Sequence, residues 1–286
     1  INQNTGIIEV GSGSNVSSSI GIYGENANNV LNDGIVKFAE YGVGIYGKNN
    51  NITNNGSIIG NAGRATGIYA VGSSVNNTGN IVVGDSANGI FVKNGGSIVN
   101  TGNITVGGNN SSGIYGTGTT NISHNSGVIT TGNNSVGIAT NSGNIIVNSG
   151  AGIIAGKEST HIYTISGTAV NNADMQMSDY SVGMYTNTGV LKNNANIVLG
   201  KSDKNAVSVK ISIGMAAESG TIENHGIINV KYDSGIGMVI NKGGAAINYG
   251  DIDVLGKEAY GMQGMNSAIL ENRGTINVNG INSKGI

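Results

Sequence analysis

Asn77-Thr78-Gly79-Asn80-Ile81-Val82-Val83 leads into Gly89-Ile90-Phe91 and then into Ser97-Ile98-Val99-Asn100. In each of these segments apolar residues alternate with polar ones, which is the period-two pattern of a half-buried β-strand. Glycine and asparagine separate the segments, and these residues favour tight turns. No window has a helical period, and glycine disfavours helix. The stretch therefore predicts three short strands joined by turns.

The Gly-Ile-Tyr segment recurs along the whole chain at spacings of 22–24 residues, apart from one longer interval before Gly214. Its copies begin at Gly21, Gly44, Gly67, Gly89, Gly113, Gly137, His161, Gly183, Gly214, Gly237, Gly261 and Gly285. A unit of this size cannot bury its apolar face alone, so neighbouring units must stack. We predict an all-β, right-handed parallel β-helix of about 12 coils, with 22–24 residues and three strands per coil. We expect residues 1–286 to form one continuous segment, a fragment of a longer array.

A second marker, an asparagine that opens a turn, shares this period. In several units it follows an apolar strand residue by two positions, as Asn77 follows Val75, so both side chains should point inward. Stacked amides can donate to and accept from one another, as in cross-β fibrils. We predict an internal ladder of Asn54, Asn77, Asn100, Asn125, Asn148, Asn172, Asn194, Asn224, Asn248 and Asn272. The alternative is that these asparagines are exposed turn residues.

The composition excludes several classes of protein. Glycine occupies 50 of 286 positions, while proline, cysteine and tryptophan are absent, so the chain is neither collagen nor a disulfide-stapled module. Hydrophobic residues make up 38% and recur in order, which argues against disorder. The net charge of −2 argues against an electrostatic nucleic-acid binder. No apolar run reaches the length of a membrane span.

Candidate catalytic groups are scarce. His124, His161 and His225 occupy three different places in the repeat and are not paired with other ligands at metal spacing. Asp251 and Asp253 flank an inward isoleucine, so both should project from one strand at a separation that suits an inverting glycosidase. The stacked neighbours Ile227, Asn229, Thr275 and Asn277 add no acid or base. We expect no enzyme activity, no catalytic residue, no cofactor and no metal site, with a glycan-degrading β-helix as the less favoured alternative.

The residue after each inward isoleucine should point outward. Stacking then aligns aromatic rings on one outer face, with a break at Ala139: Tyr23, Tyr46, Tyr69, Phe91, Tyr115, Tyr163 and Tyr185. Such a strip suits contacts with proteins or sugars, although stacked rings also stabilise neighbouring coils. Two units carry insertions, residues 11–19 and 201–210, which should form loops. We take Tyr23, Tyr46, Tyr69, Phe91 and Tyr115, with Lys201 and Lys204 of the second insertion, as candidate binding residues.

The tandem pattern, as in Asn77-Thr78-Gly79-Asn80-Ile81-Val82-Val83 followed by Gly89-Ile90-Phe91, resembles the passengers of type V secreted autotransporter adhesins, especially fusobacterial-type outer-membrane adhesins. The resemblance rests on repeat style over the whole chain and carries no functional residue. It implies a rod on a bacterial cell surface, with a C-terminal outer-membrane barrel beyond this segment. Implied partners are host-cell proteins, glycans or partner bacteria. A structural stalk that presents a distant binding tip is the alternative.

Overall fold

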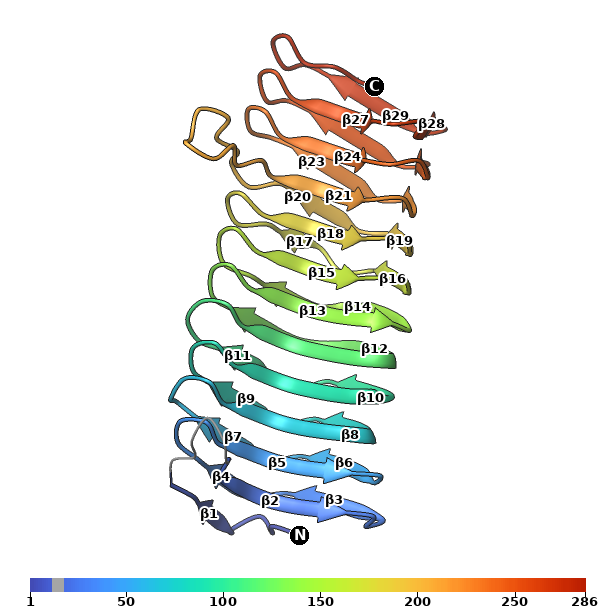
Figure 1. The fold of residues 1–286 in the computed structure, drawn as a ribbon. Helices are drawn as coiled ribbons and strands as arrows, with labels where there is room; N and C mark the ends of the chain where they lie inside the picture. Colours follow the sequence, from blue (N-terminus) through green and yellow to red (C-terminus); the bar gives the residue numbers. More distant parts are fainter. Residues whose placement is uncertain (12–17) are drawn as a thin grey trace. The chain divides into compact units, whose positions relative to one another are not determined.

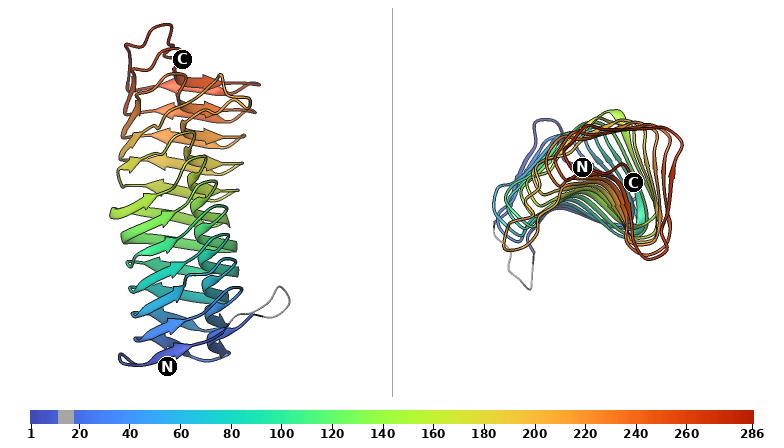
Figure 2. Two further views of the ribbon diagram at one scale, coloured as in Figure 1. Left: turned by 90° about the vertical axis from the view of Figure 1, so that its left-hand side faces the viewer. Right: turned by 90° about the horizontal axis from the view of Figure 1, so that it is seen from above.

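The computed structural model describes residues 1–11 and 18–286. They form a parallel β-solenoid of about 11 turns, against the 12 expected, consistent with a right-handed β-helix (Figure 1). The described residues contain no helix, and therefore no apolar helix of membrane-spanning length. The chain divides into two compact units, unit 1 (Ile1–Ile153) and unit 2 (Ile154–Ile286). Within each unit the turns lie over one another around a shared interior (Figure 2).

Unit 1 stacks three series of parallel strands. The Gly-Ile-Tyr series contains β2 (Ile20–Glu25), β5 (Val43–Lys48), β8 (Thr66–Asn77), β10 (Asn88–Asn100), β12 (Ser112–Thr131) and β13 (Val136–Ser142). The second series contains β3 (Asn29–Asn32) and β6 (Asn51–Asn54), continues through later parts of β8, β10 and β12, and reaches β14 (Asn144–Ile154). The third contains β1 (Ile7–Glu9), β4 (Ile35–Lys37), β7 (Ser57–Gly60), β9 (Asn80–Val83), β11 (Ile104–Val106) and the end of β12.

Unit 2 repeats the same arrangement with shorter strands. Its Gly-Ile-Tyr series is β15 (Thr160–Thr164), β18 (Val182–Thr186), β21 (Ile213–Ala217), β24 (Ile236–Ile240) and β27 (Tyr260–Gly264). The second series is β16 (Thr168–Asn171), β19 (Val190–Asn193), β22 (Thr221–Asn224), β25 (Ala245–Asn248) and β28 (Ile269–Asn272). The third is β17 (Met175–Gln176), β20 (Asn196–Val198), β23 (Ile227–Val230), β26 (Asp251–Val254) and β29 (Thr275–Val278).

The core consists of equivalent residues stacked in register. Ile45 pairs with Ile68, and Ile68 with Ile90, and all three are 0% exposed. The glycine before each of these isoleucines allows the coils to approach closely. A Cβ atom on Gly67 would lie 2.5 Å from both the Gly89 carbonyl oxygen and Ile81 Cγ2. The recurrence of glycine in this segment is therefore a packing requirement.

An internal asparagine ladder runs through each unit. In unit 1 the Nδ2 atom of each asparagine donates to Oδ1 of the next at 2.7–2.8 Å, in the order Asn2, Asn32, Asn54, Asn77, Asn100. In unit 2 the order is Asn171, Asn193, Asn224, Asn248, Asn272, at 2.8–2.9 Å. Most rungs also donate to the carbonyl two residues ahead, as Asn77 does to Gly79 at 3.2 Å. Both amide hydrogens are satisfied in this way, which removes the cost of burying the amide.

The predicted ladder is confirmed at Asn54, Asn77, Asn100, Asn224, Asn248 and Asn272, but it is wrong at four positions. Asn125, Asn148, Asn172 and Asn194 lie on the outer side, where Asn148 bonds Asn125 and Asn194 bonds Asn172, each at 2.7 Å. In these four coils the inward-facing residue is the one immediately before the predicted asparagine. The inner positions are therefore occupied by His124, Val147, Asn171 and Asn193.

A second set of buried polar side chains, which the sequence analysis missed, lies at the corner before several of the Gly-Ile-Tyr strands, where other coils have alanine or glycine. Buried Ser111 and Ser135 accept a backbone N–H from the preceding coil at 3.4 and 3.1 Å, and Ser181 accepts one in unit 2 at 3.3 Å. The residue before each serine adopts a positive φ, as at Asn110 and Asn134. In the sequence these serines look like ordinary turn residues, because only their common period distinguishes them.

Candidate functional site

Five aromatic rings lie on the outer side of unit 1, and we call this set the aromatic column. Its members follow the inward isoleucines of β2, β5, β8, β10 and β12 and therefore point outward: Tyr23, Tyr46, Tyr69, Phe91 and Tyr115. Successive ring centroids are 5.2, 5.6, 5.1 and 5.4 Å apart. Tyr115 pairs with Ala139, where the column ends as the sequence predicted.

The remaining two rings of the predicted strip form a pair in unit 2. Tyr163 stacks on Tyr185 with centroids 5.6 Å apart. The Tyr185 hydroxyl donates to Glu218 at 3.2 Å. Burial, with help from the Glu218 charge, raises the pKa of Tyr185 to about 12, so this phenol stays protonated at physiological pH.

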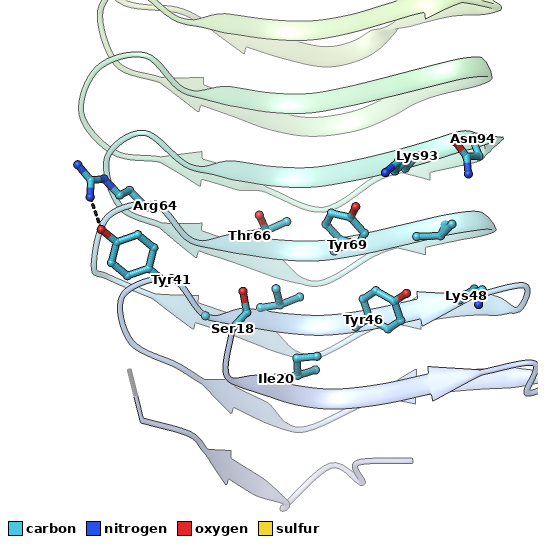
Figure 3. Close-up of a pocket in the computed structure, with 13 residues that line it drawn as sticks. Ser18, Ile20, Tyr41, Tyr46, Lys48, Arg64, Thr66, Tyr69, Lys93 and Asn94 are labelled. Atoms are coloured by element: carbon cyan, nitrogen blue, oxygen red, sulfur yellow. Dashed lines mark hydrogen bonds between the residues drawn. The ribbon is translucent and has the colours of Figure 1, made fainter. Parts of the chain in front are cut away.

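A depression of about 530 Å³ lies over the middle of the aromatic column (Figure 3). The rings of Tyr46 and Tyr69 lie one above the other inside it, with their faces open to the viewer. We call it the unit 1 depression. It is lined by Ser18, Ile20, Tyr41, Gly42, Val43, Tyr46, Lys48, Arg64, Thr66, Tyr69, Val71, Lys93 and Asn94.

Basic side chains border the unit 1 depression on two sides, and we call Lys48, Arg64 and Lys93 its basic rim. Lys48 and Lys93 both pair with Val71, so they stand two coils apart in one outward column beside the rings. Arg64 lies at the opposite side, where it bonds the Tyr41 hydroxyl and sits 5.4 Å from that ring. Lys48 is paired with Glu25, whereas Arg64 and Lys93 form no ion pair among the described residues.

The tyrosine hydroxyls differ along the column. Tyr23 donates to Glu25, which raises the pKa of Tyr23, while Lys48 lowers the pKa of the Glu25 carboxyl. Tyr115 donates to Asn141 at 3.2 Å. In the described part of the chain, the hydroxyls of Tyr46 and Tyr69 have no hydrogen-bond partner. The two central phenols therefore present unused donors and acceptors to the depression.

The two insertions contribute separately. Residues 12–17 of the first lie outside the described residues, although Ser18 borders the unit 1 depression. The second is closed by backbone hydrogen bonds between Asp203 and Lys210, at 2.6 and 3.0 Å. Lys204 forms an ion pair with Glu258, and the Lys201 ammonium lies 5.9 Å from the Tyr232 ring centroid. Lys201 and Lys204 thus belong to unit 2 and do not line the depression that holds the tyrosines.

The histidines do not form a reactive set. Asn100 donates to Nδ1 of His124 at 3.1 Å, so the Nε2–H of the neutral ring donates to the Gly152 carbonyl at 3.1 Å. Burial lowers the pKa of His124 and lowers that of His161 to about 4. His225 lies 3.1 Å from a Glu223 oxygen and stacks on Tyr249. Each ring therefore has a local structural environment of its own.

The carboxylates do not gather either. Asp251 and Asp253 pair with Ile227 and Asn229 on one side and with Thr275 and Asn277 on the other, as the sequence predicted. Asn277 donates to Asp253 at 2.8 Å. No group of three or more His, Cys, Asp or Glu residues with metal-binding geometry occurs in residues 1–11 and 18–286.

A family model described as the BigA third pectate lyase-like domain matches residues 88–285. The chain belongs to this family. The BigA third-domain family is a β-helix family associated with bacterial surface proteins. No curated protein and no solved structure matches the chain. Of the unit 1 depression, only Lys93 and Asn94 fall within the residues that match the BigA third-domain model.

Proposed function

We propose that this chain is a non-catalytic binding segment of an autotransporter-type adhesin on the outer membrane, and that it attaches the cell to host cells or other bacteria. The observation that carries the proposal is the unit 1 depression, in which Tyr46 and Tyr69 present adjacent rings and hydroxyls that have no partner among the described residues. Tyrosine provides contact area at a low entropic cost and combines apolar and polar recognition.

The surroundings of the rings support this proposal. The strands that carry Tyr46 and Tyr69 are paired on both sides, so the backbone beneath them is fixed. The inner ladder of the same coils, Asn54 to Asn77 to Asn100, ties these coils together. A binding surface on such a rigid support loses little conformational entropy when a ligand docks.

The experiment is a binding assay of the purified chain on host epithelial cells and on other bacteria. A Tyr46→Ala/Tyr69→Ala variant should lose most of the binding. A Tyr163→Ala/Tyr185→Ala variant, which removes the equivalent stacked pair from unit 2, is the matched control and should bind like the unaltered chain. Circular dichroism and thermal melting report whether each variant keeps its fold.

Two other functions are tested by the same binding assay and by a separate activity assay. If the chain binds no cell while a longer protein that contains it does, the segment is a stalk for a distant tip. If polygalacturonate incubated with the chain gains the absorbance of unsaturated sugar products, the segment is a glycan-degrading enzyme and the proposal is wrong. The dispersed carboxylates, with Asp251 and Asp253 flanked by uncharged neighbours, favour the binding function.

A further inference from the structure

We propose that the ligand of the unit 1 depression is an anionic oligosaccharide, a chain of carboxylated or sulfated sugars. The proposal rests on the binding function proposed above and names its ligand class. It is carried by the combination of the two central tyrosines with the basic rim, because these groups provide sugar contacts and anion contacts on one surface.

The charge of the rim is the first argument. Lys48 is neutralised by Glu25, but Arg64 and Lys93 have no carboxylate partner in the described part of the chain, although acidic residues outnumber basic ones overall, 16 to 14. Two uncompensated cations therefore stand on opposite sides of the rings on a protein of net negative charge. A guanidinium binds carboxylate or sulfate oxygens through two parallel hydrogen bonds, and an ammonium binds them as a point charge.

The repeat distance is the second argument. Centroids in the aromatic column are 5.1–5.6 Å apart, which is comparable to the length of one sugar residue in an extended glycan. Lys48 and Lys93 are two coils apart, a separation of about 10 Å at the usual strand spacing. A glycan that follows the solenoid axis would place successive sugars over successive rings, with an anionic group within reach of the rim.

The corner geometry at Arg64 is the third argument. Arg64 has φ of +58°, and Tyr41, at the equivalent place one coil earlier, has φ of +57°. Two later coils of unit 1 use asparagine there, Asn110 and Asn134, which accepts the left-handed conformation at little cost. Unit 2 has a positive φ at the same corner with Glu158, Tyr180 and Glu258, so this corner accepts large side chains, and at Tyr41 and Arg64 it places them at the border of the depression.

The same surface disfavours an extended peptide as the ligand. An extended peptide binds a sheet by adding a strand to an open edge, but β5, β8 and β10 are each paired on both sides. Sugar hydroxyls can instead bond the phenol groups of Tyr46 and Tyr69, which have no hydrogen-bond partner among the described residues.

The test measures the affinity of the full chain for three probes of equal length: a sulfated heparin oligosaccharide, its desulfated but still carboxylated form, and the carboxyl-reduced neutral form. We expect both charged probes, or one of them, to bind at least about tenfold more tightly than the neutral probe. An Arg64→Gln/Lys93→Gln variant should lose about tenfold or more for the charged probes and keep the affinity for the neutral one. The control Lys37→Gln/Lys192→Gln changes the net charge equally, away from the depression, and should bind as the unaltered chain does.

Several results would overturn the inference. Equal affinity for the charged and neutral probes contradicts the role of the rim. The same conclusion follows if the control variant binds the charged probes as weakly as the Arg64→Gln/Lys93→Gln variant, because binding would then follow net charge alone. If no probe binds while cells are still bound through Tyr46 and Tyr69, the ligand is of another class and the proposed function survives. If neither probes nor cells are bound, both proposals fail.

Discussion

The side-chain amide of Asn77 donates to Oδ1 of Asn100, 2.7 Å away on the next coil, and both residues are 0% exposed. Asn77 in turn accepts the amide of Asn54 at 2.7 Å and donates to its own Gly79 carbonyl. A single side chain thus connects three coils and closes its own turn. The ladder therefore fixes the spacing and register of the coils that carry the aromatic column.

Replacement of Asn77 by alanine should destabilise unit 1 by about 2–4 kcal/mol, because it removes three buried hydrogen bonds and leaves the Asn100 oxygen without a donor. Hydrogen exchange of the backbone amides around Gly79 and Asn100 measures the loss locally, which suits a repeat protein that need not unfold as a whole.

Asn76→Ala is the control, because Asn76 is the exposed neighbour on the same strand. It should change stability by no more than about 0.5 kcal/mol. A comparable loss in both variants would mean that the stability comes from strand propensity and not from the ladder.

Gly67→Ala should lower the free energy of unfolding by about 3 kcal/mol or more, although the backbone at Gly67 has an ordinary φ. The added Cβ would lie 2.5 Å from a backbone oxygen of the next coil and 2.5 Å from Ile81, so the coils must separate. Gly150→Ala, whose Cβ would meet nothing closer than 3.4 Å, should be well tolerated. Urea unfolding of both variants measures the difference. Equal midpoints would show that close packing is not what selects glycine in the Gly-Ile-Tyr segment.

The repeat was readable from the sequence because the same residue types recur at the same interval, so stacking in register follows from the alignment of Ile45, Ile68 and Ile90. The inner face was harder to assign where two amides or several apolar residues are adjacent. In β16 the buried residue is Ala169 and the larger Val170 points outward, so hydrophobicity alone selects the wrong frame and Asn172 instead of Asn171.

The unit 1 depression was only partly predictable. The aromatic column follows from strand alternation, whereas Arg64 and Lys93 join it through corner and strand positions that carry no repeated residue type.

The stability of unit 2 should decrease on mild acidification because of His161. This residue occupies the place that glycine holds in the other described coils; it is 0% exposed, and its Nε2 has no hydrogen-bond partner in residues 1–11 and 18–286. Burial lowers the pKa of His161 from 6.5 to about 4, so the fold accommodates only the neutral ring. The unfolded chain binds a proton below pH 6.5 and the folded chain does not. Stability is therefore complete above pH 6.5 and falls as the pH drops toward 4, by on the order of 3 kcal/mol.

Unfolding midpoints measured between pH 4 and pH 7 check this dependence. A His161→Gly variant should have a shallower slope over that interval, whatever its absolute stability. His225→Gln removes an exposed histidine beside Glu223 and should keep the slope of the unaltered chain. An unchanged slope in His161→Gly would show that the acid sensitivity does not come from His161.

The aromatic column should matter more for binding than for folding. Tyr69→Ala removes one half-buried ring between Tyr46 and Phe91 and should destabilise unit 1 by only about 1 kcal/mol, the size of an aromatic pair on a sheet surface. The same variant should weaken binding to cells at least about tenfold, because it opens the middle of the depression. Tyr163→Ala breaks the Tyr163–Tyr185 stacked pair of unit 2 at a similar expected cost in stability and should leave cell binding unchanged. Melting curves and cell-binding isotherms on the two variants separate the roles. If Tyr69→Ala loses several kcal/mol of unfolding free energy but still binds cells as tightly as the unaltered chain, the rings serve only to hold the coils together.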